Sequence, residues 1–118
     1  MPNQSDLLML RDKLRKFAEA RDWGQFHSPK NLSMALMVEV AELMEHFQWL
    51  SEAQSASLAA EKKTAVADEL ADILLYLVRL SDKLEVDLLE AALGKLEKNA
   101  AKYPAEQARG NAKKYSEY

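Results

Sequence analysis

Two apolar stretches, residues 32–50 and 70–80, constrain the fold of this chain more than any other feature. In the first stretch, hydrophobic side chains fall on nearly every side of a helix, and such a helix is expected to be enclosed by neighbouring elements. Ala, Leu, Glu, Lys and Met dominate the 118 residues, whereas only three glycines and three prolines interrupt them. These residues favour helices, and no strand pattern competes with them. The sequence therefore predicts an all-α fold.

Start and stop signals divide the chain into four helices. Ser5 is an N-cap candidate for the first helix, Gly24 is a stop signal in the loop that follows it, and Ser28-Pro29 can start the second helix. Small polar residues over 51–57 indicate a break, and Asp87 forms a capping-box pattern with Glu90 at the start of the last helix. The helices are expected over residues 5–22, 28–50, 58–84 and 87–102.

Length, charge and cysteine content limit the classes to which the chain can belong. We expect one domain over residues 1–118, and a helical core this small is often completed by self-association. The net charge of −3 argues against a surface that binds a nucleic-acid polymer, and the absence of cysteines excludes disulfides and thiolate metal sites. No signal peptide is visible, and the longest apolar run, Ile73 to Val78, is too short to cross a bilayer. The expected location is cytoplasmic, with no membrane partner.

Four acidic residues depart from the apolar pattern. Glu39 and Glu42 lie three residues apart on the second predicted helix, and so on one face of it. On the third helix Glu69 and Asp72 repeat this spacing, and two antiparallel helices can bring such pairs together. Four facing carboxylates would repel one another unless a hard cation such as Mg²⁺ or Mn²⁺ lay between them. Spacing alone leaves an ordinary solvated face as an equal alternative. The polar residues of the third helix form one thin stripe, made of Glu69, Asp72, Tyr76 and Arg79.

The segments around these acids carry a recognisable pattern. Glu39-Val-Ala-Glu42-Leu43 and Asp68-Glu-Leu-Ala-Asp72-Ile-Leu-Leu-Tyr-Leu77 stand on two apolar helices joined by a short connector. This ExxE…ExxD pattern resembles that of the all-α nucleoside triphosphate pyrophosphohydrolases, the MazG-like superfamily. The resemblance is closer to the dCTP pyrophosphatase branch and covers about residues 17–115. The other segments that carry it are Trp23-Gly-Gln-Phe-His27-Ser-Pro-Lys-Asn31-Leu, Phe47-Gln-Trp49, Lys95-Leu-Glu-Lys-Asn99, Lys102-Tyr-Pro104 and Arg109-Gly-Asn-Ala-Lys-Lys-Tyr115.

The resemblance implies a fold, a reaction and a set of partners. The fold is a four-helix MazG-like bundle completed by homo-oligomerisation, as a tetramer or a dimer. The reaction is Mg²⁺-dependent cleavage, with Mn²⁺ as a substitute, between the α- and β-phosphates of dCTP or a modified dCTP. Its products are the monophosphate and pyrophosphate. The resemblance also assigns roles to individual residues, and these are Glu39, Glu42, Glu69 and Asp72 as metal ligands, Lys95, Asn99, Tyr103 and Lys114 as phosphate contacts, and Trp23, His27 and Trp49 as base contacts.

Phosphoryl transfer needs an aligned water as well as neutralised charge, and Glu42 is our candidate to orient that water.

Two positions depart from the family pattern and leave the preferred base open. Many relatives carry an acid immediately before the first motif, where this chain has Val38, and a histidine of the first helix is here Leu14. The alternative is a non-catalytic helical oligomerisation or nucleotide-binding module. A ferritin-like redox bundle is disfavoured because it needs Glu-x-x-His on two helices, whereas the third helix contains no histidine and the chain has only two.

Overall fold

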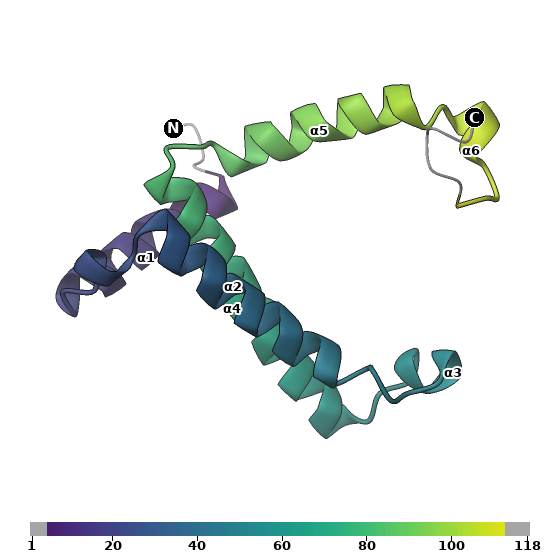
Figure 1. Ribbon diagram of the computed structural model, residues 1–118, viewed down its shortest axis with the longest axis horizontal. Helices are drawn as coiled ribbons and strands as arrows, with labels where there is room; N and C mark the ends of the chain where they lie inside the picture. The colour runs from purple at the N-terminus through teal and green to yellow at the C-terminus, as the bar shows by residue number, and fades with distance from the viewer. Residues whose placement is uncertain (1–4, 113–118) are drawn as a thin grey trace. The chain divides into compact units, whose positions relative to one another are not determined.

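The computed structural model of the protein describes residues 5–112, and every regular element within that range is helical (Figure 1). The all-α prediction is therefore confirmed. No helix in the described range is long and apolar enough to cross a bilayer. The elements are α1 (Asp6–Ala20), the 3-10 helix η1 (Gly24–Phe26), α2 (Pro29–Glu45), α3 (Glu52–Ser55), α4 (Ala60–Lys83), α5 (Leu88–Lys102) and α6 (Ala105–Ala108).

The chain divides into two units, Met1–Val86 and Asp87–Tyr118. In the first unit α2 lies along α4, and α1 packs against α4 from another side (Figure 1). The second unit contains α5 and α6. The pairing of α2 with α4 matters most, because these two helices carry the predicted acidic motifs.

The starts of the long helices follow the predicted caps. The Ser5 side chain accepts a hydrogen bond from the backbone N–H of Leu8 at 3.2 Å, which satisfies one free donor of α1. Ser28 does the same for α2, accepting from the N–H of Asn31 at 3.1 Å, with Pro29 in the first turn. Asp87 caps α5 in the same way. Three of the four predicted helix starts therefore rest on side chains that the sequence identified.

The ends of α1 and α4 use residues that the sequence did not identify. Asp22 has φ 52°, and around it the N–H of Trp23 donates to the carbonyl of Ala18 at 3.0 Å. Glu85 has φ 57°, and the N–H of Val86 donates to the carbonyl of Ser81 at 2.9 Å. Both ends are Schellman motifs, which usually place glycine at the left-handed position. The predicted stop signal Gly24 instead begins η1, two residues after the turn.

The second helix is shorter than predicted. It ends at Glu45 instead of at about Leu50, and residues 46–49 form turns. The predicted break over residues 51–57 contains the short helix α3, whose capping box links Ser51 and Gln54 in both directions. A local side-chain cap can hold four residues in a helix even where no apolar stripe exists.

The buried core of the first unit is small. Its buried hydrophobic residues among those described are Ala18, Leu32, Val66 and Val78. By contrast, α2 exposes 57% of Met34, 64% of Met37 and 55% of Met44, and these residues recur at helical spacing along one stripe. The expectation that this helix is enclosed is therefore not met within a single chain. Exposed apolar faces of this kind occur at interaction surfaces and in ligand-binding grooves.

Candidate active site

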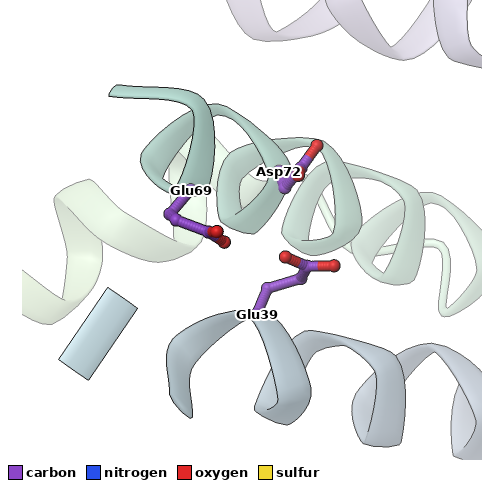
Figure 2. A group of neighbouring side chains, drawn as sticks. All are labelled: Glu39, Glu69 and Asp72. Carbon is purple, nitrogen blue, oxygen red and sulfur yellow. The ribbon is translucent and has the colours of Figure 1, made fainter. Parts of the chain in front are cut away.

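Three acidic side chains meet where α2 lies along α4. Glu39 extends from α2, and Glu69 and Asp72 extend from successive turns of α4. Each of the three offers a carboxylate oxygen, and these oxygens all lie within 4.8 Å of one another. Figure 2 shows Glu39 and Glu69 pointing toward each other between the two helices, with Asp72 one turn along. The helix pairing therefore brings Glu39 of the first acidic motif close to Glu69 and Asp72 of the second.

The carboxylates of this cluster have too few hydrogen-bond donors around them to compensate for their burial. The Oε2 atoms of Glu39 and Glu69 are buried and have no hydrogen-bond partner in the described part of the chain. The pKa of Glu39 is raised from 4.5 to about 7, first by burial and then by the carboxyl groups of Glu69, Glu42 and Asp72. Buried carboxylate oxygens without a donor are normally satisfied by a cation or a proton. An all-oxygen donor set of this kind fits Mg²⁺ or Mn²⁺.

Glu42 stands apart from this group of three. Its side chain is exposed on α2, and it is not one of the acids whose oxygens meet within 4.8 Å. It lies close enough to contribute to the raised pKa of Glu39. Its predicted roles as a metal ligand and as the group that orients water remain predictions.

A cavity of about 160 Å³ opens beside the acids. Two of the three predicted base contacts, Trp23 and His27, line this cavity, and so does Asp72 of the acidic cluster. Asp72 therefore belongs both to the acidic cluster and to the lining of the cavity. The third predicted base contact, Trp49, does not line this cavity and is 86% exposed in the turn after α2. The cavity is lined by Leu14, Phe17, Ala18, Trp23, His27, Leu32, Asp72, Leu75, Tyr76 and Arg79.

Aromatic contacts shape one wall of this cavity. The rings of Phe17 and Trp23 meet edge to face, with centroids 5.6 Å apart, and the rings of Trp23 and His27 meet edge to face at 6.3 Å. The guanidinium of Arg21 stacks over Phe17 at 3.6 Å from the ring centroid. This arrangement leaves flat apolar surfaces that can contact a planar ligand.

Sequence reasoning missed Arg79. This residue is 8% exposed, and its Nε donates a hydrogen bond to Nδ1 of His27 at 3.1 Å. The signal was present, because Arg79 ends the thin polar stripe that begins at Glu69 on the third predicted helix. An arginine at that spacing also fits a solvated surface, so the sequence could not assign it to the cavity.

The predicted phosphate contacts belong to the second unit. Lys95 and Asn99 lie one helical turn apart on α5, and Tyr103 is its C-cap. The backbone N–H of Tyr103 donates to the carbonyl of Asn99 at 2.8 Å. Lys114 lies outside the described residues. The common helix face agrees with a shared role, which remains a prediction.

Comparison with known proteins identifies the family. The model of the MazG-like family matches residues 34–118, which include both acidic motifs. The chain belongs to the MazG-like family. It is similar to the crystal structure of a pyrophosphatase from Archaeoglobus fulgidus, with a TM-score of 0.81 and 40% identity over 88% of this chain and 97% of that one.

Curated relatives of this MazG-like chain are dCTP pyrophosphatase 1 from the rat and from human. The rat protein is 45% identical and the human protein 43% identical, each over 104 residues that make up 86% of this chain. The chain spans only 61% of the length of these relatives. The relatives agree with the resemblance that the motifs indicated.

Proposed function

We propose that this MazG-like chain hydrolyses dCTP or a modified dCTP to the monophosphate and pyrophosphate, with Mg²⁺ at the acidic cluster. The observation that carries the proposal is that Asp72 belongs both to the acidic cluster and to the aromatic cavity. A ligand with its phosphates at the acids would therefore have its base at Trp23 and His27. The names of the rat and human relatives support dCTP as the substrate.

The size of the cavity supports a pyrimidine. Its volume is about 160 Å³, and an apolar cavity of about 150 Å³ in another protein holds one benzene ring. A single six-membered ring therefore fits this volume. Edge-to-face rings of Phe17 and Trp23 provide apolar contacts for such a ring.

The acidic side chains prepare the phosphate end of the site. A divalent cation held by Glu39, Glu69 and Asp72 would neutralise phosphate charge and increase the acidity of a bound water. Glu42, exposed beside Glu39, can accept a hydrogen bond from the attacking water and take its proton. Lys95 and Lys114 would add positive charge around the leaving pyrophosphate.

The exposed stripe of α2 supports self-association. Met34, Met37 and Met44 leave an apolar face that one chain does not cover, and a second copy offers the same face in return. Trp49 is 86% exposed and lies outside the cavity of its own chain. To contact a base, it would have to reach the cavity of another copy, so we propose a homo-oligomer, a dimer or a tetramer.

A nucleotide panel with Mg²⁺ tests the proposed reaction. Purified protein is incubated with canonical and modified nucleoside triphosphates, and the released pyrophosphate and orthophosphate are quantified separately. We expect pyrophosphate with no orthophosphate, and the highest kcat/KM for dCTP or a modified dCTP. Release of orthophosphate, or binding of nucleotide without turnover, would contradict the proposal, and the second result would favour the non-catalytic module.

A matched pair of variants on α4 links the activity to the site. Asp72→Asn removes a carboxylate that both the acidic cluster and the cavity use, so we expect kcat/KM to fall at least about 100-fold. Asp68→Asn removes the same charge from an exposed position four residues earlier and should change the rate less than about twofold. Equal effects of the two substitutions would show that Asp72 has no special role.

A further inference from the structure

The hydrogen bond between Arg79 and His27 fixes the direction of donation. The Nε of Arg79 lies 3.1 Å from Nδ1 of His27. A guanidinium has only donors, so Nδ1 must be the acceptor and cannot carry a proton. In a neutral imidazole the single proton then belongs to Nε2, which is also the ring nitrogen left for a ligand.

We propose that Arg79 holds His27 in the Nε2-protonated tautomer, so that His27 presents one N–H donor to a pyrimidine in the cavity. The role of the donor rests on the proposed function, whereas the tautomer itself does not. Arg79 is a positioning residue in this proposal, because it acts on the ligand through the histidine.

Two other charged residues hold Arg79 in place. Its Nη1 lies 3.6 Å from Oδ2 of Asp82, and both side chains are 10% exposed. Asp82 also accepts a pair of hydrogen bonds from Arg15, of which the bond from Nε is 2.7 Å long. The network therefore runs from Arg15 on α1, through Asp82 and Arg79 on α4, to His27 in the loop before α2. A paired, buried guanidinium of this kind keeps one orientation.

The surroundings of His27 favour the neutral ring that the proposal needs. Burial lowers the pKa of His27 below its ordinary value of 6.5, and the positive charges of Arg79 and Lys83 lower it further. A protonated ring would place an N–H at Nδ1 against the donor of Arg79. The same bond that orders the tautomer therefore also opposes the charged form.

A fixed N–H donor selects the edge of the base. The ring nitrogen N3 and the oxygen O2 of cytosine are neighbouring acceptors, whereas uracil carries a proton on N3. O2 is an acceptor in both bases, so the two are distinguished only if the Nε2–H group faces N3, where it donates to the lone pair of cytosine but meets the N–H of uracil. Two donors placed against each other at N3 leave the N–H of His27 without an acceptor there, which weakens the binding of uracil. The proposal therefore predicts preference for cytosine over uracil.

Nuclear magnetic resonance of the ring nitrogens tests the tautomer without any turnover. In ¹⁵N-labelled wild-type protein near pH 7, we expect Nδ1 of His27 to show the shift of an unprotonated nitrogen and Nε2 that of a protonated one. The chain has two histidines, so His46→Gln assigns the signals. Protonation at Nδ1, or two averaged nitrogen shifts, would overturn the proposal.

Two variants separate the hydrogen bond from the positive charge. Arg79→Met removes the donor while Asp82 keeps Arg15 as its partner, and we expect the two nitrogen shifts of His27 to move toward each other. Lys83→Met removes a positive charge near His27 but not the bond, so the two shifts should stay apart. Unchanged shifts in Arg79→Met would overturn the assignment to Arg79.

Kinetics test the consequence for the base. In Arg79→Met we expect KM for dCTP to rise about 3- to 10-fold, the loss of roughly one hydrogen bond, with kcat within about twofold of wild type. KM for dUTP should change less than about twofold. Equal changes for both substrates would overturn the role in base selection. If the tautomer is found but no nucleotide is hydrolysed, the proposed function fails while the assignment of Arg79 stands.

Discussion

Replacing Glu39 by glutamine separates the two roles of the acidic cluster, because it should stabilise the metal-free protein and abolish its stabilisation by Mg²⁺. The carboxylate of Glu39 is partly buried beside Glu69, and its Oε2 has no hydrogen-bond partner in the described residues. An amide of nearly the same shape carries no charge, so it relieves the repulsion. The same amide is a poor ligand for a hard cation.

The magnitude follows from the pKa of Glu39, which is raised from 4.5 to about 7. Because the pKa of Glu39 is higher in the folded protein than in the unfolded chain, the folded protein binds more protons than the unfolded chain at pH values between these two pKa values. The destabilisation is therefore absent below about pH 4, grows as the pH rises through this window, and is complete above pH 7. If the whole pKa difference of Glu39 is converted into free energy of unfolding, the upper bound is about 3 kcal/mol. Because Glu39 is only partly buried, solvent screens the charge, and we expect about 1–2 kcal/mol, or roughly 4–8 °C in Tm.

Thermal unfolding at one protomer concentration, in EDTA and in saturating Mg²⁺, measures both effects. At pH 8 in EDTA, Glu39→Gln should unfold at higher temperature than wild type, and the difference should vanish near pH 4. Wild type should gain about 3 kcal/mol at a Mg²⁺ concentration 100 times its Kd, and the variant should gain little. Glu45→Gln is the matched control, because it removes the same charge from an exposed position on α2. A variant that is less stable than wild type in EDTA would refute the reasoning.

Three further predictions concern other parts of the molecule. Because a cation must displace the proton of Glu39, whose pKa is about 7, Mn²⁺ affinity measured by electron paramagnetic resonance should fall as the pH drops from 8 to 6; a pH-independent Kd would contradict this. Ser28→Ala removes the cap of α2 and should lower the free energy of unfolding by about 1 kcal/mol in urea denaturation, with Ser33→Ala as an exposed control. Met37→Glu places a charge on the exposed stripe of α2 and should shift sedimentation toward the monomer, whereas Lys30→Glu should not; equal sedimentation of both variants would argue against that interface.

Local chemistry explains why the helix starts could be predicted. A serine hydroxyl satisfies a free N–H within three residues, so the information needed at Ser5 and Ser28 is contained in a few neighbouring residues. The acidic motifs were predictable for a related reason. A spacing of three places Glu69 and Asp72 on one helix face whatever surrounds the helix.

The helix ends depend on more distant information. Asp22 and Glu85 both adopt the left-handed conformation, although their side chains do not favour it as glycine does. The chain must turn at these points for α1 and α4 to finish where their packing ends. Gly24 lies two residues beyond the first turn, and tertiary packing outweighed its stronger local signal.

The aromatic residues show a different limit. The resemblance implied that both Trp23 and Trp49 contact the base, but Trp23 lines the cavity of its own chain, whereas Trp49 does not line it and is 86% exposed. The sequence near a tryptophan does not determine which distant segment of the chain its side chain contacts. Arg79 shows the reverse case, because its place in the polar stripe was visible but its partner, His27, is 52 residues away in the chain.

The polar stripe of α4 accounts for the two ends of the site together. Glu69, Asp72, Tyr76 and Arg79 follow one another by three, four and three residues, so a single straight helix face carries all four. From Asp72 to Arg79 the helix rises about 10 Å, at about 1.5 Å per residue. The helix therefore fixes the distance between the acids, which suit phosphates, and the arginine, which orders His27. Under the proposed function, a nucleotide would reach from the acids to His27, whereas a free phosphate or a free base would reach only one of these ends.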